Sequence, residues 1–279
     1  MTQISIVKLT PALWRVRFDN QPINLIDSQT VVELRAIVEA AEADPEVAVI
    51  LFESANPDYF LAHWDLADDG ALQASLPPGS TGQHPWLDVL IRISKLPVVT
   101  ISAIRGRVRG AGSEFVLATD IRFASRERAV LGQFEMATGV VPGAGAPARL
   151  PRLVGRGRAI EIMAGAEDFD GDLAERYGYV NRAISDADFQ DFITAFAARV
   201  ARFDRRAIAE LKQWVDPLTL PDDAEFPPQL DAFFAAVSRP EVLAHIGRLF
   251  DQGLQQPGPV EERLGEYAAQ TAEPSEAVS

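Results

Sequence analysis

The 279-residue sequence contains no cysteine. It therefore has no disulfide, thiolate zinc site or cysteine nucleophile, and this absence fits a reducing compartment. A membrane-spanning helix is indicated by an apolar run of about eighteen residues, and no run in this sequence approaches that length. The N-terminus also lacks the basic start and long apolar stretch of a signal peptide. These absences predict a cytoplasmic protein with no membrane partner.

Basic residues are scarce relative to acidic ones. The chain carries 26 Lys and Arg against 40 Asp and Glu, which gives a net charge of −14. Such a surface repels phosphate backbones and anionic lipids, so a nucleic acid is not an expected partner. An anionic ligand would require a local basic patch. Hydrophobic residues at 47% and charged residues at 24% nevertheless supply an ordinary globular core.

Strand and helix patterns alternate over the first 130 or so residues. Strands are expected on either side of Thr10 and at 47–52, 97–103, 121–124 and 129–131, and helices after Asp27, at 86–94 and after glycines at 106–112. The run at 47–52 is continuously apolar, as in a buried parallel strand. Segment 67–85 is rich in glycine and proline and predicts a mobile surface loop that shapes a pocket. This order favours an α/β fold.

The pattern from residue 146 onward is mostly helical. Candidate helices cover about 146–153, 156–164, 170–177, 186–202, 204–214, 228–236 and 240–252. We expect a core over 1–200, a C-terminal helical subdomain over 201–268 and a disordered tail over 269–279. The strands therefore belong to the first unit, and the second is helical.

Three glycines, Gly106, Gly110 and Gly112, lie between an expected strand and an expected helix. Glycine permits sharp turns and close backbone approach, and free amides at a helix start can hold an oxyanion. The alternative is a tight connection without a ligand. The spacing matches neither the dinucleotide fingerprint nor the lysine-bearing phosphate loop. Ser113 also lacks the glycine two residues later that a nucleophile elbow requires.

Two glutamates each lie beside a glycine-rich segment. Glu114 follows the first such segment, and Glu135 precedes a second one at 139–145. Paired carboxylates in one pocket can divide the roles of general base and general acid. The alternative for Glu114 is a surface carboxylate that complements a helix dipole. Their separation in sequence does not decide between these readings.

Three ordered segments together resemble the crotonase, or enoyl-CoA hydratase/isomerase, superfamily. The resemblance covers about residues 5–200 and depends on three signatures. The matching positions are Phe60, Ala62, Asp65 and Leu66; then Gly106, Gly110, Gly112, Glu114, Asp120 and Ile121; then Gly132, Glu135, Gly139, Pro142, Gly143, Gly145, Arg149 and Leu150.

The resemblance implies a spiral of ββα turns with a C-terminal helical subdomain, assembled as a homotrimer or hexamer. It implies an acyl-CoA thioester substrate, a place in fatty acid metabolism, and no metal or cofactor beyond the coenzyme A of the substrate. Backbone amides of Ala62 and Ala111 would form the oxyanion hole. Glu114 would activate water, and Glu135 would exchange a proton at the α-carbon.

The favoured activity is that of a lyase, the hydration of a 2-enoyl-CoA, because two carboxylates suit water addition. An isomerase is the alternative enzyme, since one carboxylate suffices to move a proton. A non-catalytic acyl-CoA-binding scaffold is the alternative from a different class. Retention of both glutamates favours an enzyme.

One departure from the family pattern and two further features concern the substrate. His63 replaces the usual glycine, either as a thioester-contacting imidazole or, as we favour, as a packing residue. Trp64 is expected to form a wall of the acyl pocket. Arg105, Arg107 and Arg109 alternate on a strand, where they could face the coenzyme A phosphates or pair with the many acids. The sequence favours neither role for the arginines.

Overall fold

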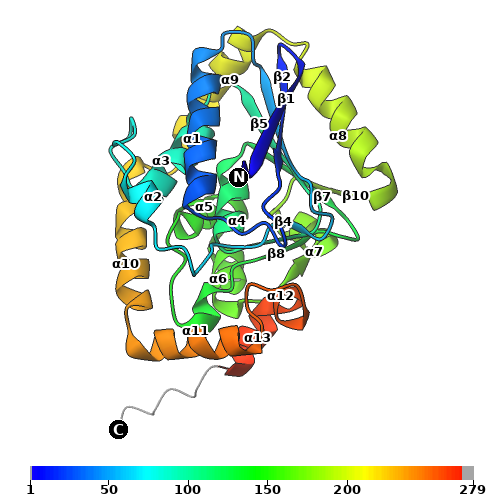
Figure 1. The fold of residues 1–279 in the computed structure, drawn as a ribbon. Coiled ribbons are helices and arrows are strands. Elements are labelled where there is room, and N and C mark those ends of the chain that lie inside the picture. The colour runs from blue at the N-terminus through cyan, green and yellow to red at the C-terminus, as the bar shows by residue number, and fades with distance from the viewer. Residues whose placement is uncertain (1, 272–279) are drawn as a thin grey trace.

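A parallel sheet with one antiparallel edge strand forms the centre of the protein (Figure 1). The computed structural model describes residues 2–271. The strand order is β1-β2-β3-β5-β7-β10, and only β1 runs antiparallel to its neighbour. The bounds are β1 (Ile4–Thr10), β2 (Leu13–Phe18), β3 (Val49–Ser54), β5 (Val99–Ile104), β7 (Ile121–Ser125) and β10 (Arg182–Ile184).

Alternate residues of β3 enter two different cores. Ile50 and Phe52 join the large cluster with α1 and α3, whereas Val49 and Leu51 pack in the cluster that includes residues of α8 and α9. A strand buried on both faces reads as a continuous apolar run. The prediction of a buried parallel strand is therefore confirmed.

A second, four-stranded sheet has the order β4-β6-β8-β9. Its strands are short: β4 (Tyr59–Leu61), β6 (Arg107–Arg109), β8 (Val130–Gly132) and β9 (Phe169–Asp170). Strand β6 lies between the glycine turn and α4 (Ala111–Ala118), where the sequence predicted a turn that opens the helix directly. The two sheets and the later helices confirm the predicted α/β class with C-terminal helices.

Helices cover the sheets and build the C-terminal half. The remaining helices are α1 (Ser28–Ala43), α2 (Ala71–Ala74), α3 (Pro85–Lys95), η1 (Glu135–Thr138), α5 (Ala146–Val154), α6 (Arg156–Gly165), α7 (Gly171–Tyr177), α8 (Asp186–Val200), α9 (Arg205–Thr219), η2 (Asp223–Glu225), α10 (Pro227–Val237), α11 (Pro240–Gln252), α12 (Pro259–Glu262) and α13 (Leu264–Thr271). In Figure 1, α10 and α11 follow two edges of the molecule, and α12 and α13 lie beside the end of α11. None of the helices within 2–271 is long and apolar enough to cross a membrane.

Segment 67–85 is more ordered in its contacts than an irregular loop. Helix α2 lies within it, Gln73 is buried, and Asp68 accepts hydrogen bonds from the amide and hydroxyl of Ser28 at 3.0 and 2.5 Å. The prediction of a loop without helical structure is wrong at α2. The expected tail begins at 269, where α13 still continues to Thr271, and its remainder lies outside the described residues.

Candidate active site

A cavity of about 380 Å³ lies where the N-terminus of α4 meets η1 and the C-terminal helices. It brings together five of the six predicted site residues and leaves out only Ala62. Its polar lining includes His63, Glu114 and Glu135. Its apolar lining comes from Trp64, Leu66, Trp86, Phe134, Val140, Leu230, Phe233, Phe234, Val237, Ile246, Leu249 and Leu254.

Glu114 lies in the first turn of α4 and is buried at 2% exposure. Its Oε1 accepts hydrogen bonds from the amides of Ala144 and Ala146, at 2.7 and 3.0 Å. These amides lie at the start of α5, where a helix favours negative charge. Because both bonds fall on Oε1, Oε2 is the oxygen that a water could approach.

Glu135 begins η1 and reaches the same cavity. A Cβ at Gly110 would lie 3.1 Å from Oε1 of Glu135 and 3.0 Å from the Phe134 ring. Gly110 also has a φ of 50°, which a residue with a side chain rarely adopts. Glycine at this position therefore lets Glu135 lie against the start of α4.

Burial dominates the titration of both carboxyl groups. It raises the pKa of Glu114 to about 7, although the two amides and Arg149 act in the opposite direction. Burial, followed by the charge of Glu114, raises the pKa of Glu135 well above its ordinary value. Two carboxyl groups that repel in this way favour a state in which one is protonated and one is ionised. The pair can therefore supply an acid and a base near neutral pH.

A buried polar network orients Glu135. With the Gln133 amide nitrogen facing the carboxylate, it donates to Oε2 and Oε1 of Glu135 at 3.0 and 3.1 Å, and its oxygen accepts from Ser113 at 2.9 Å. The Ser113 hydroxyl also contacts the Tyr179 hydroxyl. Gln133, Ser113 and Tyr179 are all 0% exposed. Sequence reasoning missed this role of Ser113, because its partners come from the segments that follow β8 and α7.

Ala111 is the first residue of α4, so its amide has no partner within the helix. It lines the cavity, and no acceptor for this amide lies among the described residues. The structure thus places this predicted amide where an oxyanion could accept a hydrogen bond from it.

The prediction that Ala62 donates to an oxyanion is wrong. Its amide donates to the carbonyl of Asn24 at 3.0 Å, and Ala62 does not line the cavity. The reason is a partner from the segment before α1, which sequence spacing does not reveal.

Within the described part of the chain, the backbone amide of Trp64, unlike that of Ala62, is free to donate a hydrogen bond into the cavity. The carbonyl of His63 accepts a hydrogen bond from the Ile26 amide at 2.8 Å. The carbonyl and N–H of one trans peptide point to opposite sides, so the N–H of Trp64 faces away from Ile26. Trp64 lines the cavity, and its amide has no acceptor within residues 2–271.

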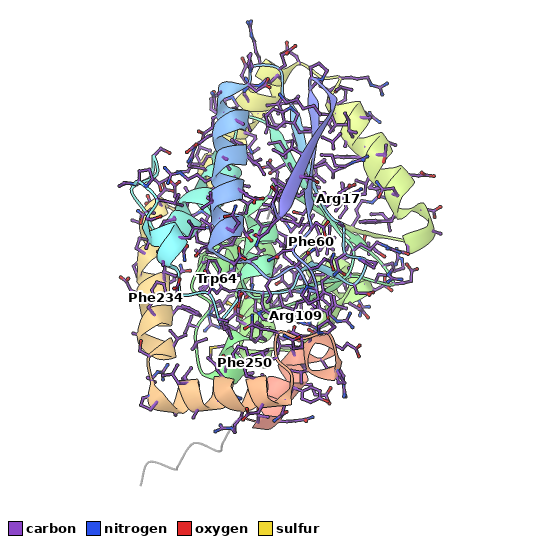
Figure 2. The ribbon with its side chains drawn as sticks, in the orientation of Figure 1. Arg17, Phe60, Trp64, Arg109, Phe234 and Phe250 are labelled. Atoms are coloured by element: carbon purple, nitrogen blue, oxygen red, sulfur yellow. The ribbon has the colours of Figure 1, made fainter. Side chains whose placement is uncertain are left out.

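The side chains of His63 and Trp64 both form part of the cavity wall, at 1% and intermediate exposure. The ring of Trp64 lies edge-on to Trp86, with centroids 5.9 Å apart. Figure 2 shows Trp64 on the side of the molecule toward α10, which carries Phe234. Contact of either side chain with a substrate remains a prediction.

The arginines of 105–109 divide between two roles. Arg105 donates to both carboxylate oxygens of Asp186 at 2.7 Å, and Arg109 donates to both oxygens of Asp168 at 2.7 and 2.6 Å. These ion pairs favour the structural alternative for both residues. Arg107 instead lies over the Tyr59 ring, 5.5 Å from its centroid. Of the three, Arg107 alone stays a candidate for a phosphate contact.

Sequence reasoning missed the contribution of the C-terminal helices to the cavity. Residues from α10 and α11 complete its apolar wall, and the glycine-rich signatures carry no signal for them. Their helical periodicity predicted buried faces but could not say which cavity those faces cover.

Comparison with known proteins places this site in a family. The family description "Enoyl-CoA hydratase/isomerase" matches residues 10–225. A crotonyl-CoA hydratase of Syntrophomonas wolfei subsp. wolfei is 31% identical over 189 residues, which are 66% of this chain and 71% of that protein.

Solved structures of similar fold indicate the same family. A protein from Streptomyces avermitilis, described as a "putative enoyl-CoA hydratase", is 40% identical, with a TM-score of 0.90 over 95% of this chain and 96% of its own. An enoyl-CoA hydratase from Mycobacterium avium subsp. paratuberculosis shares the fold at 20% identity, with a TM-score of 0.77 over 88% and 97% of the two chains. The chain belongs to the enoyl-CoA hydratase/isomerase family, and it is a crotonase-family acyl-CoA enzyme.

Proposed function

We propose that this enzyme adds water to the double bond of a 2-enoyl-CoA thioester. The observation that carries the proposal is the convergence of two buried glutamates, Glu114 and Glu135, on one cavity. Raised pKa values for both carboxyl groups support a division of labour between base and acid. An isomerase would need only one of them.

The geometry supports a specific course for the reaction. The thioester oxygen accepts hydrogen bonds from the amides of Ala111 and Trp64. The carboxylate of Glu114 takes a proton from a water through Oε2 while the water oxygen bonds to the β-carbon. The electron pair of the double bond moves toward the thioester, where the two amides stabilise the enolate oxygen. Protonated Glu135 then donates its proton to the α-carbon.

The apolar lining of the cavity favours a bulky apolar acyl group. Trp64 and Trp86 meet Phe233 and Phe234 of α10 around this space, and α11 adds aliphatic side chains. A short crotonyl group would leave much of this surface without contacts, and each unfilled methylene position costs binding free energy. We therefore propose a medium-chain or aromatic 2-enoyl group.

Hydration assays with a substrate series test both parts of the proposal. The loss of the conjugated thioester absorbance is measured with crotonyl-CoA, 2-decenoyl-CoA and cinnamoyl-CoA. We expect kcat/KM for at least one of the two larger substrates to exceed that for crotonyl-CoA by about tenfold or more. If crotonyl-CoA were the best substrate, the assignment of acyl size would be wrong. Isomerisation of 3-enoyl-CoA without hydration would reject the hydratase, and failure to bind any acyl-CoA would reject the enzyme.

We also propose a homotrimer or a hexamer built from it. Helix α9 exposes Leu211, Trp214 and Leu218, with 62%, 79% and 84% of each residue accessible. Positions three, four and seven residues apart lie on one helix face, so these residues form a continuous apolar stripe. A monomer rarely leaves such a stripe to solvent.

The double variant Trp214→Asp/Leu218→Asp tests this assembly. Light scattering coupled to gel filtration should give an oligomeric mass for the wild type and a lower mass for the variant, because buried charges at an interface are costly. Leu72→Asp, the same kind of change at an exposed residue of α2, serves as the control and should keep the wild-type mass. A monomeric wild type at all protein concentrations would contradict the proposal.

A further inference from the structure

His63 is held at both ring nitrogens. Its Nε2 lies 3.0 Å from Oε1 of Glu261, and its Nδ1 lies 2.8 Å from the carbonyl oxygen of Trp64. A carbonyl oxygen only accepts, so Nδ1 carries a proton. Oε1 of Glu261 also accepts from the Gln255 amide at 2.7 Å. Burial acts to raise the pKa of Glu261, but His63 and the Gln255 amide outweigh it and lower that pKa. The carboxylate thus accepts from both neighbours, and His63 donates from both nitrogens as a cation.

The ion pair is deeply buried, and its members depend on each other. His63 is 1% exposed and Glu261 0%. Burial opposes the charge on His63, but the carboxylate and the two hydrogen bonds outweigh it and raise the pKa of the imidazole, while Arg109 acts weakly against it. Oε2 of Glu261 has no donor within residues 2–271, so His63 and Gln255 supply its compensation. Removal of one partner leaves the other as an uncompensated buried charge.

The pair lies next to the peptide that supplies an oxyanion donor. His63 immediately precedes Trp64, and its ring closes back on the Trp64 carbonyl. The carbonyl of His63 is fixed by Ile26. The N–H of Trp64 therefore lies between two fixed carbonyls, one held by the Ile26 amide and the other by the imidazole of His63.

Gln255, which precedes Glu261 in the C-terminal part of the chain, contacts the two residues that follow Trp64. The side chain of Gln255 donates to Oδ1 of Asp65 at 2.6 Å and accepts from the Leu66 amide at 3.2 Å. Arg109 in turn donates to the backbone carbonyl of Glu261 at 2.8 Å. Figure 2 shows Arg109 close to the α12 region, between the second sheet and the C-terminal segment.

We propose that His63 and Glu261 form a positioning pair. Through this pair the C-terminal segment, residues 255–261, fixes the Trp64 amide of the oxyanion hole. The proposal rests on the proposed function, because it assigns the Trp64 amide to the thioester oxygen. His63 acts through the backbone that it holds. Packing alone would require neither a cation nor two directed hydrogen bonds beside this peptide.

The variant Glu261→Gln tests the pair by steady-state kinetics. We expect kcat to fall by about 100-fold, the usual consequence of a misplaced or missing oxyanion donor, while KM changes little. Lys212→Met is the control, because it breaks a partly buried ion pair with Asp120, with side chains 10% and 25% exposed, and neither residue lines the cavity. It should lower the melting temperature and leave kcat of the folded enzyme near the wild-type value.

His63→Gln provides a second measurement if Glu261→Gln does not fold. A glutamine nitrogen can still donate to Glu261, but it cannot also bridge to the Trp64 carbonyl. We expect the same loss in kcat, and a double variant no slower than the slower single variant, because the two residues act as a unit.

The outcomes separate the two proposals. A wild-type enzyme that hydrates enoyl-CoA, with folded variants that retain kcat within about twofold, would overturn the positioning role alone. Additive losses in the double variant would also overturn it. A wild-type enzyme without hydratase activity would reject the proposed function, and the positioning role would fall with it.

Discussion

Glu114→Gln is expected to reduce hydration of the best enoyl-CoA substrate by about 10³-fold, within the range typical of a lost general base. The glutamine oxygen can still accept from Ala144 and Ala146, so the cavity should keep its shape. The loss should therefore appear in kcat, and binding of a saturated acyl-CoA should be unchanged. Stopped-flow and steady-state absorbance measurements check the rate, and calorimetry checks the binding.

The matched change Glu135→Gln should lower kcat by a similar factor but leave a different pH profile. In the wild type, activity should fall as pH decreases below about 7, because Glu114 is then protonated. It should fall again at higher pH, where Glu135 loses the proton it must donate. Glu135→Gln should remove the alkaline limb. Wild-type hydration by either single variant would contradict the assigned chemistry.

The same raised pKa has a consequence for stability. A carboxyl group with a pKa near 4.5 when unfolded and about 7 when folded binds more protons in the native state between these values. The wild type therefore loses stability as pH rises through this window. Glu114→Gln does not titrate, so it should melt at a higher temperature than the wild type at pH about 8 and at a similar temperature at pH about 4.

Arg109→Met is expected to lower the free energy of unfolding by roughly 3 kcal/mol, because it removes the four hydrogen bonds that a buried guanidinium donates. The Arg109 side chain is 1% exposed and donates to Asp168 and to the carbonyls of Glu261 and Glu262. Methionine fills similar space but leaves these acceptors without a donor. Chemical denaturation at constant pH measures the difference.

Arg105→Met is the control for this variant. Arg105 also pairs with a carboxylate, Asp186, but its side chain is 40% exposed, so water can replace the lost hydrogen bonds. Its cost should be under about 1 kcal/mol. If both variants lost the same free energy of unfolding, burial would not be the reason for the contribution of Arg109 to stability.

Local patterns predicted the parts of the fold that depend on local chemistry. The continuous apolar run of β3 requires burial on both faces, and Asp27 caps α1 by accepting from the Thr30 amide at 2.8 Å, so both elements were accessible from sequence. The glycine spacing before Glu114 likewise indicated the turn that carries this side chain into the cavity.

Partners that lie far apart in sequence could not be predicted in this way. The amide of Ala62 donates to the carbonyl of Asn24. His63 is paired with Glu261, which lies 198 residues away. Neither Asn24 nor Glu261 belongs to the three signatures on which the resemblance depends. A donor or a buried charge is assigned correctly only when every neighbour that competes for it is known.

The contacts that Gln255 and Glu261 make with residues 63–66 also have a consequence for biosynthesis. The ribosome delivers Glu114 and Glu135 long before Gln255 and Glu261. During that interval the cavity lacks α10 and α11, and the peptide of Trp64 lacks its partner from α12. A nascent chain thus carries both glutamates before the residues that complete the proposed oxyanion site have been synthesised.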